Sequence, residues 1–204
     1  MKARLAGVIL VSALCASLLV PGLAGAETGA SIITRSVSVS TRAPDASKWQ
    51  STVLDNGAKR IFKCKPLACL VPETVTFTFE KGSLTPPKPD SLQKFATVDL
   101  PAKIRASVTD PTEQVDNLFA AVTKVKSYPA VLNETRLSRA AKTAYIETAI
   151  VFTGPAIIKV ESASTNQKLA KESLSQFLDA MEIKEMQSSP TAPGASAPPA
   201  EQRL

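Results

Sequence analysis

The strongest constraint on the fold is the strict alternation in residues 73–82, ETVTFTFEKG. Val75, Phe77 and Phe79 share one parity, and threonines occupy the other. Successive side chains of a β-strand point to opposite faces, so the pattern predicts a strand with one buried and one solvent-facing side. Such a strand needs partner strands and a hydrophobic layer over one face, which makes a sheet the framework of this domain.

Other segments carry strand and hairpin signals. Valines alternate with serines within residues 31–43, which predicts a strand. Asp55-Asn56-Gly57 offers the positive-φ residues of a tight hairpin turn between strands near 49–54 and 58–64. Further strands are predicted for residues 103–108 and 130–137 and, as a hairpin around Gly154-Pro155, for residues 142–164.

Two segments carry the signals of amphipathic helices. At residues 110–126, Asp110 suits the N-cap, Pro111 the first helical position, and Glu113 completes a capping box. The apolar stripe of this segment is Val115, Leu118, Phe119, Val122 and Val125. The second helix is predicted for residues 166–183, with a stripe of Ala170, Leu174, Phe177, Leu178 and Met181. A short helix is also predicted near residues 91–98.

The order of these elements predicts an α+β fold. Hairpin connections favour an antiparallel sheet, and the two apolar helical stripes are its natural cover. We therefore expect an antiparallel sheet covered on one face by two amphipathic helices.

The two ends of the chain differ in composition from its middle. Residues 1–26 combine two early basic residues, an apolar stretch and the small-x-small site Ala24-Gly25-Ala26, which is typical of a cleaved secretory signal peptide. An uncleaved N-terminal anchor is the alternative. Residues 188–204 consist mainly of Ser, Pro and Ala and predict a disordered tail. Residues 27–187 are then a single α+β domain of a periplasmic or secreted protein, with no transmembrane segment after cleavage.

Once the signal peptide is removed, Cys64 and Cys69 are the remaining cysteines. An even pair in an exported chain favours a disulfide, and Pro66 helps to bend the short loop between them. Closing so short a loop stabilises a fold by about 2 kcal/mol. A zinc site lacks ligands, because two cysteines remain and the chain contains no histidine. A redox pair is the other alternative, although thioredoxin-like pairs have the shorter C-x-x-C spacing.

The composition also restricts catalysis and ligand binding. Without histidine, Ser-His-Asp and Cys-His arrangements are excluded within the chain. No glycine-rich phosphate loop occurs. The net charge of +6 is scattered and aromatic residues are few, which argues against nucleic-acid binding. We therefore predict no catalytic residue, no metal and no cofactor.

The long connection after residue 82 is a candidate interaction surface. It contains Pro86, Pro87, Lys88 and Pro89, and long ordered loops often carry function. Trp49 is a further candidate as a surface anchor, with a position in the core near the first hairpin as the alternative.

Residues 142–183 resemble the end of PsbP-like domains. In that family a long strand hairpin with a Ser-Ala-Ser-like step leads into a C-terminal amphipathic helix that closes with a phenylalanine. Here the corresponding residues are AIIKVESASTNQKLAKESLSQFLDAMEI, at 156–183. The resemblance does not extend to the N-terminal half. It implies an α+β sandwich and an exported accessory protein that binds other proteins.

Together these features predict an exported, non-catalytic binding or accessory protein of the bacterial cell envelope, with another envelope protein as its partner. Two alternatives stay open. A periplasmic carrier of a small ligand or lipid requires an apolar cavity between sheet and helices. A hydrolase using carboxylates or a Ser-Lys pair, such as Ser138 with Lys142, requires a pocket with ionisable groups of shifted pKa.

Overall fold

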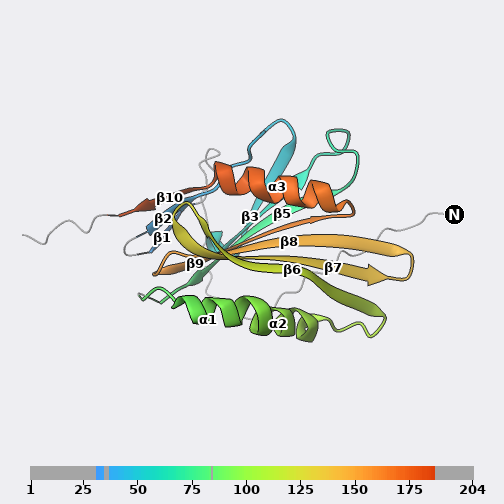
Figure 1. Ribbon diagram of the computed structural model, residues 1–204. Coiled ribbons are helices and arrows are strands. Elements are labelled where there is room, and N and C mark those ends of the chain that lie inside the picture. Colours follow the sequence, from blue (N-terminus) through green and yellow to red (C-terminus); the bar gives the residue numbers. More distant parts are fainter. Residues whose placement is uncertain (1–30, 35–36, 84, 187–204) are drawn as a thin grey trace, which may run out of the picture.

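The framework is a seven-stranded antiparallel sheet with the strand order β3-β4-β5-β9-β8-β7-β6 (Figure 1). The structure is a computed structural model that describes residues 31–34, 37–83 and 85–186. The predicted signal peptide and C-terminal tail lie outside these residues. The strands are β3 (Trp49–Leu54), β4 (Lys59–Cys64), β5 (Glu73–Lys81), β6 (Glu113–Val125), β7 (Tyr128–Arg139), β8 (Lys142–Phe152) and β9 (Ala156–Ser164).

A smaller sheet of three antiparallel strands has the order β1-β2-β10. Its strands are β1 (Ser31–Thr34), β2 (Val37–Ser40) and β10 (Glu182–Glu185). The single strand expected within residues 31–43 is thus a pair of strands. Val37 and Val39 are buried and join the core of the larger sheet.

Helices cover both faces of the large sheet (Figure 1). Helix α3 (Gln167–Ala180) packs on β5, β8 and β9. On the opposite face, α1 (Pro89–Lys94), the π-helical turn η2 (Phe95–Asp99) and α2 (Leu100–Ser107) form one continuous helical segment that contacts β6 and β7. This arrangement corrects the expectation that two helices cover one face.

The predicted alternation of β5 is confirmed, because Val75, Phe77 and Phe79 are buried beneath α3. Helix α3 begins at the predicted place, where the side chain of Asn166 accepts a hydrogen bond from the Leu169 backbone N–H at 3.2 Å. Aromatic rings fill the space between helix and sheet. The fully buried members of this group are Phe62, Phe77 and Phe177.

The helix expected at residues 110–126 is wrong: this segment is strand β6, paired with β7 along its length. Asp110 caps a turn, because its Oδ1 accepts hydrogen bonds from the N–H and the hydroxyl of Thr112 at 2.9 and 2.6 Å. A register shift between Asn117 and Phe119 leaves Leu118 as an extra residue. Such a bulge changes the parity of the following side chains, so the apolar residues imitate helical spacing.

The strand expected at residues 103–108 is also wrong, because residues up to Ser107 belong to α2. The short helix expected near residues 91–98 is present and continues into α2. Leu92, Ala96 and Leu100 are buried at four-residue spacing. Pro101 has no N–H to donate to the preceding turn, and the wider π-helical turn lies directly before it. Among the described residues, no helix is long and apolar enough to span a membrane.

Candidate functional site

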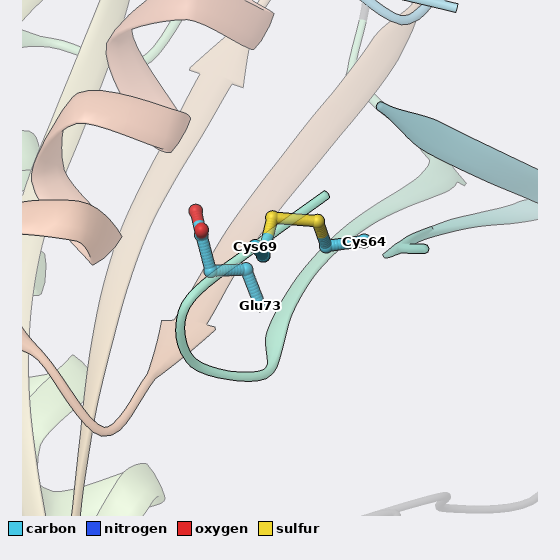
Figure 2. A group of neighbouring side chains, drawn as sticks. All are labelled: Cys64, Cys69 and Glu73. Carbon is cyan, nitrogen blue, oxygen red and sulfur yellow. A yellow bond between two sulfur atoms is a disulfide. The ribbon is translucent and has the colours of Figure 1, made fainter. Parts of the chain in front are cut away.

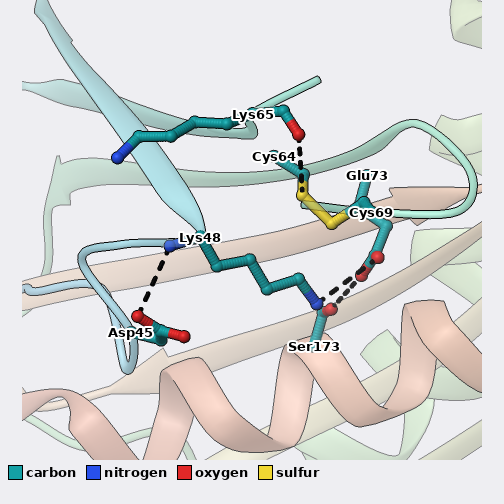
Figure 3. Close-up of a disulfide and its surroundings, with 7 residues drawn as sticks. All are labelled: Asp45, Lys48, Cys64, Lys65, Cys69, Glu73 and Ser173. Atoms are coloured by element: carbon teal, nitrogen blue, oxygen red, sulfur yellow. Dashed lines mark hydrogen bonds and ion pairs between the residues drawn. A yellow bond between two sulfur atoms is a disulfide. The ribbon is translucent and has the colours of Figure 1, made fainter. Parts of the chain in front are cut away.

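A disulfide joins the end of β4 to the loop that precedes β5. Cys64 and Cys69 are bonded, with their Cα atoms 6.2 Å apart (Figure 3), as the sequence predicts. The backbone N–H of Lys65 donates to the carbonyl of Lys48 at 2.9 Å and fixes the start of the loop against the residue before β3. Residues 64–72 are called the disulfide loop below.

The carboxylate of Glu73 is buried beside this disulfide (Figure 2). The hydroxyl of Ser173, on α3, donates to Glu73 Oε2 at 2.6 Å, and Lys48 Nζ lies 3.6 Å from Glu73 Oε1 (Figure 3). The two sulfur atoms and a carboxylate oxygen of Glu73 lie within 4.8 Å of one another. The sulfurs of Cys64 and Cys69 are joined to each other and therefore are not the thiolates that bind metal ions. This cluster connects the disulfide loop to α3.

Sequence reasoning missed the role of Glu73, although a signal for it exists. Glu73 has the same parity as Val75 and Phe77, so the strand pattern places its carboxylate on the buried face. A buried carboxylate requires hydrogen-bond or ionic partners. An acidic residue on the apolar side of a strand therefore predicts a polar contact from the covering helix.

The disulfide loop presents two leucines to solvent. Leu67 and Leu70 are wholly exposed, at 105% and 100% of the reference area. Leu67 has a φ of 73°, in a region that residues with a side chain rarely adopt. Leucine is usually buried, so two wholly exposed leucines on a loop closed by a disulfide form a candidate contact surface. The cysteine spacing is visible in the sequence, whereas the exposure of these leucines is not.

Trp49 lies in the core, which is the alternative that the sequence left open. Its side chain is 4% exposed, and its ring meets the edge of Phe177 at a centroid distance of 4.9 Å. Lys48 Nζ lies 5.3 Å from the centroid of the same ring. The indole therefore contributes to the packing of α3 and is not available as a surface anchor.

The predicted proline-rich surface borders a groove. Pro86, Lys88 and Pro89 are exposed, and Pro87 is half-buried. The groove has a volume of about 330 Å³, and its lining residues are Ser83, Thr85, Pro87, Phe152, Gly154 and Ile157. Its wall is thus formed by residues 85–89, called the proline segment below, and by the β8–β9 hairpin.

A close backbone contact just before the proline segment holds the chain against that hairpin. The backbone N–H of Gly82 donates to the carbonyl of Pro155 at 2.8 Å. A Cβ atom at residue 82 would lie 2.1 Å from the carbonyl oxygen of Gly154, so a glycine is required there. The backbone just before this segment is therefore held against the β8–β9 hairpin.

Two further glutamates are buried where the N-terminal half of α3 meets the sheet. Glu134 on β7 lies directly opposite Glu147 on β8. Glu134 accepts a hydrogen bond from the side-chain amide of Gln167, and its Oε2 lies 2.7 Å from Lys171 Nζ. Burial, and next the charge of Glu134, raise the pKa of Glu147 from the ordinary 4.5 to about 7. The hydrogen bond to Glu134 in turn raises the pKa of Lys171.

Of the two glutamates, Glu134 holds α3 against the sheet through Lys171 and Gln167. Glu147 Oε1 and the hydroxyl of Ser162, which lies opposite it on β9, have no hydrogen-bond partner among the described residues. These glutamates do not line the groove beside Pro87, nor a second groove formed by residues 42–46 and the end of α3. The raised pKa is thus a consequence of burial beneath a helix and not of an open cleft.

Comparison with solved structures identifies the fold. The solution structure of cyanobacterial PsbP (CyanoP) from Synechocystis sp. PCC 6803 matches with a TM-score of 0.52 and 11% identity, over 79% of this chain and 98% of that chain. The crystal structure of LpqN from Mycobacterium tuberculosis, described as involved in cell envelope biogenesis, matches with a TM-score of 0.52 and 13% identity, over 72% of this chain and 84% of that chain.

Comparison by sequence finds no match, whereas comparison by structure does. A scan against protein-family models finds no match, and a sequence search of curated proteins finds none. The structural likeness spans most of the chain, whereas the sequence resemblance is confined to residues 142–183. At such low identity the likeness shows the fold alone, and that fold is PsbP-like.

Proposed function

We propose that this protein is an exported, non-catalytic accessory protein of the bacterial cell envelope that binds another envelope protein. The observation that carries the proposal is the apolar groove beside Pro87. The disulfide between Cys64 and Cys69 supports an oxidising location, periplasmic or extracellular. The structural likeness to LpqN, whose description places it in cell envelope biogenesis, supports the same compartment.

The groove has the chemistry of a site for an extended apolar segment of a partner. Phe152, Ile157 and Pro87 supply apolar walls, and Lys88, which follows Pro87 in the chain, is exposed. Prolines have few conformations to lose, and the backbone at Gly82, before the prolines, is held against the β8–β9 hairpin. Binding here would therefore order little of this protein, which favours association through buried apolar area.

The alternative of a ligand carrier has less support. The space between α3 and the sheet is occupied by aromatic rings, with Phe62 and Phe77 at centroid distances of 4.8 and 6.1 Å from Phe177.

The alternative of a carboxylate hydrolase is also weaker. Glu134 is engaged by Lys171 and Gln167 of α3, and Glu73 by Ser173.

Affinity capture from native envelope extracts tests the proposal. Tagged protein of residues 27–204 would be used at low and high salt, with captured proteins identified by mass spectrometry. We expect a partner that persists at high salt, because salt screens charges but not apolar contacts. Pro87→Ser should release it. Val53→Ser, at a 47% exposed position on β3, is the matched control and should retain it. A partner unaffected by Pro87→Ser, or none at either salt, would contradict the proposal.

A further inference from the structure

The disulfide loop has exposed leucines, and the loop together with the preceding strand β4 carries basic but no acidic residues. Leu67 and Leu70 are wholly exposed at its surface. From Lys59 to Pro72 the chain contains lysines and an arginine but no acidic residue. The next residue, Glu73, is buried and engaged by Ser173 and so does not offset this charge at the surface.

Two lysines precede the exposed leucines in the chain. Lys63 is exposed, and Lys65 is half-buried at the base of the loop. One donor of the Lys65 ammonium is used by the carbonyl of Ala46, at 2.9 Å. An ammonium group has three donors, so Lys65 can still bind an anionic group. The loop thus offers apolar side chains at its surface and cations at its base.

We propose that the disulfide loop is a lipid-contacting element that inserts Leu67 and Leu70 into the interfacial region of an anionic bilayer. Lys63 and Lys65 would then meet the lipid phosphates. Peripheral membrane binding depends on this combination, because buried apolar area and attraction to anionic headgroups add together.

The residue types of the loop favour a lipid surface over a protein partner. Protein interfaces are enriched in aromatic residues and arginine and depleted in lysine, and leucine is under-represented at their most important positions. Residues 63–72 contain three leucine or valine residues and two lysines, but no aromatic residue and no arginine. A fluid bilayer has no shape to match, so two flexible aliphatic side chains and two lysines suffice.

The rest of the molecule holds the loop in a fixed position for this contact. The disulfide closes it, and Glu73 ties its end to α3 through Ser173 (Figure 3). The loop lies at the start of β5, whereas the groove beside Pro87 follows the end of β5. The two surfaces therefore lie at opposite ends of one strand, so the loop can meet a bilayer while the groove stays accessible.

Vesicle sedimentation tests the proposal directly. Oxidised protein of residues 27–204 would be mixed with vesicles of equal parts phosphatidylglycerol and phosphatidylethanolamine, or of phosphatidylcholine alone. We expect binding to the anionic vesicles that weakens as salt is added.

Leu67→Ser with Leu70→Ser should reduce binding roughly tenfold or more. Lys63→Gln with Lys65→Gln should reduce it by about fivefold per lysine. Val53→Ser, also an exposed aliphatic position, should bind as wild type.

A second measurement reports insertion itself. Leu67→Trp places an indole at a wholly exposed position. Its fluorescence should shift to the blue when anionic vesicles are added, because the ring leaves water. An unshifted spectrum, or equal binding by the leucine double variant and wild type, would overturn the proposal. The proposal would also be overturned if the wild-type protein did not bind vesicles but captured an envelope protein that the leucine double variant did not capture. That result would assign the loop to a protein partner. Pro87→Ser should leave vesicle binding unchanged, so the two proposals can fail separately.

Discussion

Three buried glutamates at the junction of sheet and α3 give single residues a strong influence on stability. Glu73 and Glu134 have partners on α3, whereas Glu147 Oε1 has no hydrogen-bond partner among the described residues. A buried carboxyl without a partner is easier to keep protonated than charged. These residues therefore respond differently to pH and to substitution.

Glu147 should make the protein less stable as pH rises. Its pKa of about 7 in the folded state exceeds the ordinary 4.5, so the folded state binds the proton more tightly than the unfolded state. The free energy of unfolding then falls between these two pH values and stays reduced above about pH 7. Glu147→Gln should remove this decline and stabilise the protein by about 1–3 kcal/mol at alkaline pH.

Urea titrations at mildly acidic and mildly alkaline pH would measure this effect. Glu161→Gln is the control, because Glu161 is half-exposed and pairs with Lys159 at 2.8 Å. If the free energies of unfolding of wild type and Glu147→Gln change with pH in parallel, the pKa of Glu147 is not raised in the folded state.

Ser173→Ala should destabilise the fold by about 1–3 kcal/mol, because it leaves the buried Glu73 carboxylate with the more distant Lys48. Ser175, an exposed serine on the same helix, provides the control with an identical change in helix propensity. Thermal unfolding would separate the two variants. Equal midpoints for Ser173→Ala and Ser175→Ala would show that the contact with Glu73 contributes nothing.

At the scale of elements, β6 shows why local signals can mislead. The Asp-Pro-Thr sequence that begins a helix in many proteins here forms a turn, in which Asp110 binds Thr112. The bulge at Leu118 breaks the period of two on which a strand prediction depends. This segment forms a strand because it pairs with β7. A pattern confined to residues 110–126 does not include that partner strand.

Val122→Ala distinguishes a helix from a strand at residues 113–125 by the sign of its effect on the free energy of unfolding. Alanine stabilises a helix relative to valine but destabilises a strand. Because Val122 lies within β6, we expect a loss of about 0.5–1 kcal/mol in the free energy of unfolding. A urea midpoint that rises in the alanine variant would support the helix instead.

The disulfide is a local element and should contribute a local stabilisation. Replacing Cys64 and Cys69 by serine should cost about 2 kcal/mol, the value for a very short closed loop. The transition should remain cooperative, since the core residues beneath α3 are unaffected. Complete unfolding of the double variant at room temperature would show that the disulfide supports much more than the loop.

For the whole molecule, the sequence predicts most of the half that lies beneath α3. The alternation of β5, the β8–β9 hairpin and the stripe of α3 all depend on local periodicity, and all are confirmed. The second helical layer was not predicted as such. Its buried residues, Leu92, Ala96 and Leu100, have helical spacing, but Pro101 directly follows them, and a proline usually ends a helix prediction.

The candidate surfaces were predictable to different degrees. The disulfide followed from the number of cysteines and the predicted signal peptide, and the proline segment from its composition. The groove beside Pro87 depends on the distant residues Phe152 and Ile157, which only the folded sheet brings to the same place. The exposure of Leu67 and Leu70 is likewise a property of the loop conformation, because leucine is usually buried.

Site-specific photo-crosslinking in living cells would test the central claim, that the proline segment binds an envelope protein, most directly. A photoreactive amino acid would replace Lys88, which is exposed and directly follows Pro87, and in a control would replace the exposed Val53 on β3. Binding at the groove predicts a discrete adduct with one envelope protein from residue 88 and none from residue 53. No adduct at residue 88, or the same adducts at both positions, would contradict it.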